Sequence, residues 1–265
     1  MKIDKIIVKT KETTYPILVG NGSISLLKKQ VNKLCPNTKK IAVIFDKNVP
    51  NIFKTKIKKL LKKYKIFIKD YSPSERLKNF SNVNILIEYL IKNKFNRNDL
   101  VIAVGGGIIG DFSGFVASIF KRGINFINVP TTLLAQVDSA IGGKTGVNSK
   151  NGKNLIGSFY QPKLVISDIS FLKSLPKREF ICGFGEILKY SLIKDQKFFN
   201  FIKKNSKQIL KGSDLNILKY IVLRSSKNKV HFVVADEKES NKRMVLNFGH
   251  TFAHGIESSN NFSKK

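Results

Sequence analysis

Two of the three histidines in the chain stand four positions apart near its end. His250 and His254 belong to the segment LNFGHTFAHGIE, residues 246–257, and the third histidine is His231. On a helix, residues i and i+4 project from the same face, so two imidazoles can bind one metal ion or converge on one substrate. The alternative interpretation is a pair of unconnected surface histidines on a helix.

A second candidate for metal chemistry lies upstream, in the segment GFGEILKY, residues 183–190. Helical spacing places Glu186 and Lys189 on one face of this segment. From ligand chemistry alone, Glu186 with His250 and His254 would form a three-ligand catalytic metal site with one position open.

A glycine-rich segment favours phosphate binding. The sequence GGGIIGD, residues 105–111, follows the apolar run 100–104 and fits the pattern G-x-G-x-x-G. Glycines let backbone amides approach a pyrophosphate closely, and a following helix N-terminus attracts negative charge. The acidic residue usual about 20 positions downstream is absent, so a tight strand-to-helix turn is the alternative. Asp46, at the end of an earlier strand, could hold an adenosine ribose instead.

The segment 130–148 also contains glycines next to a lysine. GKT at 143–145 suggests a P-loop, but Asp138 stands where that motif requires its first glycine, so the P-loop interpretation fails. What remains is a glycine-rich loop, which either binds an anion or is a solvated loop in a lysine-rich protein. Its candidate anion ligands are Lys144, Lys153 and Asn154.

The elements that must position these residues follow from hydrophobic periodicity. Short apolar runs predict strands at 6–8, 15–19, 41–45, 65–68, 100–104, 126–129 and 164–166, with a helix over 52–63 between two of them. Helical periodicity dominates from Phe180 to Leu223. We therefore predict an α/β domain with a parallel sheet over residues 1–170, followed by an all-α domain over residues 171–265.

Composition narrows the class of protein. The hydrophobic fraction of 42% suits a globular chain, no apolar run reaches the ~20 residues of a membrane span, and no signal peptide is recognisable, so we expect a cytoplasmic protein. Two cysteines, Cys35 and Cys182, are too few for a disulfide framework. The net charge of +30 leaves a nucleic-acid-binding role open. Because the cations are overwhelmingly lysines spread along the chain, solvated lysine-rich faces are the simpler interpretation.

Several motifs in order resemble those of the 3-dehydroquinate synthase family, over nearly the whole chain. They are GIIGD at 107–111, PTTLLAQVDS at 130–139, GGKTG at 142–146, GKN at 152–154 and LNFGHTFAH at 246–254. Related sugar-phosphate cyclases and iron-type alcohol dehydrogenases fit these motifs less well. The resemblance implies a Rossmann-like first domain and a homodimer.

The activity that the resemblance implies belongs to aromatic amino-acid biosynthesis. Members convert the sugar phosphate DAHP (3-deoxy-D-arabino-heptulosonate 7-phosphate) into 3-dehydroquinate and phosphate. Transient oxidation of an alcohol by NAD is followed by phosphate elimination, reduction back and an intramolecular aldol closure, with Zn²⁺ or Co²⁺ at the reacting hydroxyls. Another sugar-phosphate cyclase activity is the alternative.

The resemblance also implies site residues. For NAD they are Asp46, Ser74, Glu75, Arg76, Leu77, Lys78, Gly105, Gly106, Gly107, Ile108, Ile109, Gly110, Asp111, Thr131, Thr132, Lys144, Lys153, Phe171, Leu172, Lys173 and Ser174. For the metal they are Glu186 and His250. For the substrate they are Asp138, Lys144, Asn154, Lys189, Lys229, Arg243, Asn247 and His254, with Arg122 reaching the phosphate site of a neighbouring subunit.

The chain departs from the family pattern at a few positions. Asn241, Ala253 and Gly255 replace residues common in the family, and we expect these changes to be tolerated. The resemblance assigns His254 to the substrate and implies a third metal ligand, a histidine, beyond Lys265, together with another substrate-binding lysine. We therefore expect residues 1–265 to keep the NAD-binding domain but to bind metal weakly and to be catalytically impaired.

Overall fold

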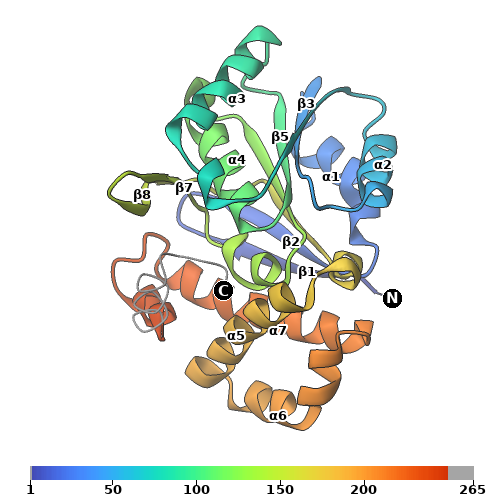
Figure 1. Ribbon diagram of the computed structural model, residues 1–265, viewed down its shortest axis with the longest axis vertical. Helices are drawn as coiled ribbons and strands as arrows, with labels where there is room; N and C mark the ends of the chain where they lie inside the picture. The colour runs from blue at the N-terminus through green and yellow to red at the C-terminus, as the bar shows by residue number, and fades with distance from the viewer. Residues whose placement is uncertain (1, 250–265) are drawn as a thin grey trace.

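A seven-stranded sheet forms the centre of the computed structural model, which describes residues 2–249 (Figure 1). Its strands, in spatial order, are β1 (Asp4–Lys9), β2 (Thr14–Gly20), β9 (Leu164–Asp168), β6 (Asn125–Pro130), β5 (Leu100–Gly105), β3 (Lys40–Asp46) and β4 (Lys65–Tyr71). All neighbours are parallel except β1 and β2, which form an antiparallel pair at one edge. The predicted strands and the predicted α/β fold are confirmed.

Helices cover both faces of the sheet. They are α1 (Leu27–Leu34) and α2 (Asn51–Leu60) on one side, with α3 (Phe80–Lys92) and α4 (Gly107–Ile119) on the other (Figure 1). Successive strand residues explain the two layers, because side chains alternate between faces. Val43 and Ile102 pack in the cluster that contains α1 and α2, whereas Ile44 and Ala103 pack in the cluster that contains α3 and α4. Burial on both faces is why these strands are continuously apolar.

Within the described residues, three α-helices follow the last strand and lie below one end of the sheet (Figure 1). They are α5 (Lys177–Lys194), α6 (Gln196–Lys211) and α7 (Leu215–Ala235). Asp195 caps α6 by accepting the amide of Phe198 at 3.0 Å, and Asp214 caps α7. Ile17 and Val165 of the sheet share one hydrophobic cluster with Ile221 of α7. The helical character predicted after Phe180 is confirmed, and the boundary at 170 stays a prediction.

One expectation about local structure is wrong. The segment predicted as a glycine-rich loop is an antiparallel hairpin of β7 (Lys144–Ser149) and β8 (Gly152–Phe159). Gly146 and Gly157 are directly opposite each other, and a Cβ on Gly157 would lie 2.3 Å from the Thr145 carbonyl oxygen. The glycines therefore permit close approach of the two strands rather than a turn.

None of the helices within residues 2–249 is long and apolar enough to cross a membrane. The predicted helix carrying His250 and His254 lies outside the described residues. The last described element is a short 3₁₀ helix, η6 (Lys242–Asn247).

Candidate active site

The carboxyl ends of the central strands bring together the residues predicted to bind a dinucleotide. Gly105 ends β5 beside Pro130 of β6, and Asp46 ends β3 on the other side. A Cβ on Gly105 would lie 2.9 Å from the Asp46 Cβ, and a Cβ on Gly106 would lie 3.1 Å from Thr132 Cγ2. Only bare backbone fits here, and α4 begins at once, so amides and the positive end of a helix dipole meet at this turn.

Asp46 is a buried carboxylate at this turn. It accepts the backbone amide of Asn48 at 2.8 Å, and burial raises the pKa of its carboxyl group. The carboxylate stands at the carboxyl edge of the sheet, where parallel α/β folds bind nucleotides. This arrangement fits the predicted ribose contact.

A second group of predicted cofactor residues lies between the glycine turn and the hairpin. Lys78 is 3% exposed, and its ammonium donates to Asp111 at 2.7 Å and to Asn154. Burial raises the pKa of Asp111, and Lys78 opposes that shift. Asn148 ties the hairpin to the segment 75–78 by donating its backbone amide to the Lys78 carbonyl at 2.8 Å.

Other predicted cofactor residues have side chains that are either buried in the core or exposed to solvent. The side chains of Phe171 and Leu172 are buried in the hydrophobic core, with the Phe171 ring centroid 4.2 Å from that of Phe53. Lys173 and Ser174 are exposed, and so is Lys153 on β8. Only the backbone of Phe171 and Leu172 therefore remains for a ligand.

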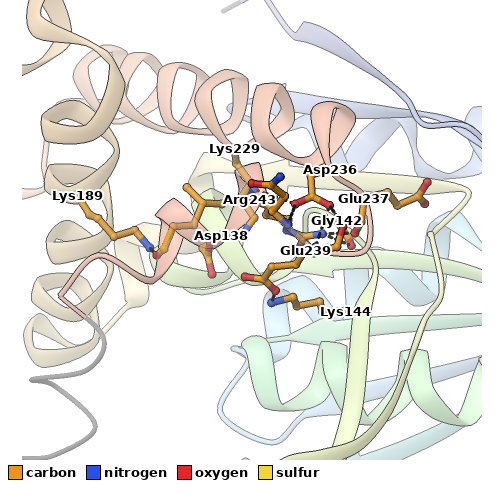
Figure 2. A network of polar contacts seen from close by, with 12 residues as sticks. Asp138, Gly142, Lys144, Lys189, Lys229, Asp236, Glu237, Glu239 and Arg243 are labelled. Carbon is orange, nitrogen blue, oxygen red and sulfur yellow. Dashed lines mark hydrogen bonds and ion pairs between the residues drawn. The ribbon is translucent and has the colours of Figure 1, made fainter.

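A cavity of about 510 Å³ opens beside the glycine turn, and cationic side chains from separate elements line it. They are Lys144 from β7, Lys189 from α5, Lys229 from α7 and Arg243 from η6. Asp111, Asp138, Ser139, Asn154, Glu239 and Asn247 also line the cavity. In Figure 2 the four cations lie around Asp138 and Glu239. The structure thus gathers the described residues predicted to bind substrate, apart from Arg122.

Asp138 lies in a π-helical turn, Ala135–Ser139, a local irregularity common at functional sites. Its Oδ1 accepts Lys229 Nζ at 2.6 Å and the Tyr190 hydroxyl. Burial by itself would raise the pKa of Asp138, but the ammonium groups of Lys229 and Lys189 hold it well below its usual range. The carboxylate is therefore charged and fixed.

Arg243 is the largest fully buried side chain of the described residues, 1% exposed. Its Nη1 donates to the carbonyl oxygens of Glu237 at 2.7 Å and Gly142 at 3.3 Å. Its Nε and Nη2 have no hydrogen-bond partner among residues 2–249. A buried guanidinium with unpaired donors at the wall of a cavity is suited to bind an anion such as a carboxylate or phosphate.

Glu186 is 9% exposed, and its Oε1 forms an ion pair with Lys189. Burial and the nearby Asp138 carboxylate raise the pKa of Glu186. Within residues 2–249 no three His, Cys, Asp or Glu side chains are grouped to hold a metal ion. The second predicted ligand, His250, lies outside the described residues, as does His254. Glu186 on α5 is a buried carboxylate and fits a metal ion as one oxygen ligand.

Sequence reasoning missed Glu239, Ser139 and Tyr190. Glu239 pairs with Lys144 in the cavity, and its φ of 55° is a left-handed conformation. Three acidic residues, Asp236, Glu237 and Glu239, cluster before Arg243 in a chain with only 18 acidic residues, which was a usable signal. Asp236 accepts the Arg243 amide at 3.0 Å and so shapes this loop.

The fold and the site together define an α/β enzyme with a glycine-rich strand-to-helix turn and an adjacent cavity lined by cationic side chains. Residues 69–182 match the family described as 3-dehydroquinate synthase N-terminal, and residues 183–264 match 3-dehydroquinate synthase C-terminal. The chain belongs to the 3-dehydroquinate synthase family.

Individual relatives agree with this assignment. The 3-dehydroquinate synthase of Pelagibacter ubique (strain HTCC1062) is 49% identical over 266 residues, which cover 100% of this chain and 72% of that protein. The 3-dehydroquinate synthase of Alkaliphilus metalliredigens (strain QYMF) is 44% identical over 99% of this chain and 72% of its own length. A crystal structure of 2-deoxy-scyllo-inosose synthase with carbaglucose-6-phosphate, NAD⁺ and Co²⁺ superimposes with a TM-score of 0.86 at 28% identity, covering 97% of this chain and 71% of that one.

Proposed function

We propose that this protein converts DAHP into 3-dehydroquinate and inorganic phosphate, using NAD and a divalent metal such as Zn²⁺ or Co²⁺. The observation that supports this most directly is the buried Arg243, whose Nε and Nη2 lack partners within residues 2–249 at the wall of a cavity beside the glycine turn. DAHP has a carboxylate and a phosphate, which match the four cations lining the cavity. The related cyclase activity is disfavoured, because solved structures of such cyclases are 28% and 24% identical, whereas relatives named 3-dehydroquinate synthase reach 49%.

Different residues of the chain bind the substrate and orient it. Arg243 and Lys144 neutralise an anionic group, while Asn154 and Asn247 are placed at the cavity wall to bind hydroxyl groups. Asp138, fixed by Lys229, offers a charged acceptor that orients the substrate. Fixed charges of this kind stabilise charge that develops during elimination without having to reorient.

The residues at the glycine turn fit a dinucleotide, with Gly105 to Gly107 at the pyrophosphate and Asp46 at a ribose. Glu186, together with His250, would hold the metal. When bound, NAD accepts and returns a hydride, and the metal increases the acidity of a substrate hydroxyl group.

The main test measures phosphate release from DAHP by residues 1–265 with NAD and zinc supplied. Release that requires both additions supports the proposal. A folded chain that binds NAD but neither binds DAHP nor releases phosphate contradicts the proposal, whereas a chain that binds both without releasing phosphate agrees with the expectation of impaired catalysis. The same assay decides the sequence-based expectation of impaired catalysis, which full turnover would refute.

Replacement of Asp46 by Asn is expected to weaken NAD binding by roughly tenfold or more, the size of one lost hydrogen bond to a charged group. The matched control is Asp70→Asn on the neighbouring strand β4, where the carboxylate pairs with Lys54 instead. Calorimetric titration of both variants with NAD makes the comparison. Equal affinities of the two variants would refute the ribose contact.

Lys144 predicts a pH dependence of substrate binding. Partial burial, with Arg243 and Lys229 nearby, lowers the pKa of Lys144 to about 8. The protonated amine attracts an anion, so the attraction is complete below this pKa and is lost as pH rises through it. The KM for DAHP is therefore expected to rise above about pH 8. Lys144→Arg, which stays charged, should remove this rise, and the same rise in that variant would contradict the assignment.

A homodimer with Arg122 acting in the neighbouring subunit is also part of the proposal. Arg122 is exposed and does not line the cavity. It lies in a turn where Lys121, Arg122 and Gly123 all have positive φ, at 49°, 62° and 117°. Arg97 holds this turn by donating to the Lys121 carbonyl at 2.9 and 3.1 Å. Such strain persists only where the surroundings enforce it, and here it presents Arg122 outward.

Mixing two inactive variants tests the shared site. Arg122→Ala and Lys229→Met are each expected to be nearly inactive. After subunit exchange, about a quarter of the sites would combine an intact Lys229 with an intact Arg122 from the partner. Recovery of activity on mixing supports the shared site, and no recovery despite exchange contradicts it.

A further inference from the structure

The hydroxyl of Tyr190 is buried beneath the cavity and is directed at the substrate-facing carboxylate. Tyr190 lies on α5, is 0% exposed, and does not line the cavity. Its hydroxyl donates to Asp138 Oδ1. The hydroxyl is the donor in this contact, because an ionised carboxylate can only accept a hydrogen bond.

Two donors from different helices converge on the same oxygen. Lys229 of α7 donates to Asp138 Oδ1 at 2.6 Å, and Tyr190 of α5 donates to that oxygen as well. Both of these bonds are made to Oδ1, and Asp138 lines the cavity. With both donors on Oδ1, Oδ2 is left to face the substrate.

The geometry points to Tyr190 as a positioning residue that fixes the rotation of the Asp138 carboxylate for the substrate. The terminal torsion of an aspartate is broad, so a single donor does not define it. Lys229 is a compact point charge that can follow either carboxylate oxygen, whereas the Tyr190 ring is held rigidly in the core. Without the hydroxyl, the ion pair survives but the orientation of Oδ2 does not. This inference rests on the proposed function.

The first experiment compares Tyr190→Phe with Tyr160→Phe. Tyr160 is a matched control, because its hydroxyl also donates to one acceptor, the Ile124 carbonyl at 2.6 Å, and it does not line the cavity. We expect Tyr190→Phe to lower kcat for phosphate release from DAHP by roughly ten- to hundredfold, the effect of one hydrogen bond to a charged group, with little change in KM. Tyr160→Phe should leave both constants unchanged.

A double-mutant cycle with Asp138→Asn distinguishes positioning from a general structural role. If Tyr190 acts through Asp138, then Tyr190→Phe has no further effect on kcat in the Asp138→Asn background. A full additional loss there would show that the hydroxyl acts elsewhere, for example through Glu186, and would overturn the inference. A loss of thermal stability without any change in kcat would overturn it as well.

The wild-type chain separates this inference from the proposed function. Wild-type turnover combined with an unaffected Tyr190→Phe variant overturns the inference alone. A folded wild-type chain that neither turns over DAHP nor binds it in calorimetry overturns the proposed function, and the role given to Tyr190 fails with it.

Discussion

Replacement of Lys229 by Met is expected to lower kcat/KM for DAHP by about three orders of magnitude, because it breaks a buried ion pair at the centre of the cavity. The Lys229 side chain is 9% exposed and its ammonium lies 2.6 Å from Asp138. The variant loses a cation for the substrate and leaves the partly buried Asp138 carboxylate, 25% exposed, without its ion-pair partner Lys229. The free energy of unfolding should fall by about 3 kcal/mol for the same reason.

The effects on binding and on stability can be separated. Lys229→Met combined with Asp138→Asn removes both charges, so thermal stability should largely recover while activity does not. Lys227→Met is the matched control on the same helix, because Lys227 is exposed to solvent. Phosphate release and thermal unfolding, measured on all three variants, check the prediction. Activity that recovers together with stability would show that Lys229 has only a structural role.

The positions of the strands and their burial in the sheet were predictable because each strand is a short apolar run with a clear end. The run 100–104 leads into glycines, and the structure places β5 at Leu100–Gly105 with every residue buried. The hairpin of β7 and β8 was not predictable in this way. Its residues do not alternate between apolar and polar types, and its glycines appear to local rules as turn residues. Only the pairing of Gly146 with Gly157 in the structure shows that these glycines permit close approach of the two strands.

The site was predictable to the extent that motifs carry it. Lys144, Lys189, Lys229 and Arg243 were named from the sequence, and the structure brings them to one cavity. Their partners Asp138 and Glu186 were also named, but Glu239 and Tyr190 were not, because their contacts join segments that are distant in the sequence. Tyr190 contacts Asp138 across 52 positions of the sequence. Glu239 pairs with Lys144 from a left-handed backbone conformation, which hydrophobic periodicity does not predict.

The second large effect is expected at Gly142, whose backbone contacts the Arg243 guanidinium. Gly142 has φ of 100°, and its carbonyl accepts Arg243 Nη1 at 3.3 Å. A Cβ at this position would lie 2.5 Å from Arg243 Nη2 and 2.8 Å from Val233 Cγ2. The backbone at Gly142 is also fixed from the other side, since its amide donates to the buried Tyr15 hydroxyl at 3.3 Å. Because the turn is held in this way, the contact can be relieved only by movement of the Arg243 guanidinium away from Gly142.

Gly142→Ala should therefore displace the guanidinium and lower kcat/KM by about a hundredfold, mainly through KM, because a charge-assisted anion contact is lost. Left-handed strain adds a loss of stability of about 1 to 3 kcal/mol. Gly22→Ala is the matched control, because Gly22 has φ of 77° but nothing within 4 Å of its added Cβ. It should lose stability through strain and keep its activity. Steady-state kinetics with DAHP and thermal unfolding of both variants make the comparison. If the two variants lose activity equally, the loss comes from backbone strain alone, and the position of the Arg243 guanidinium does not depend on the glycine at 142.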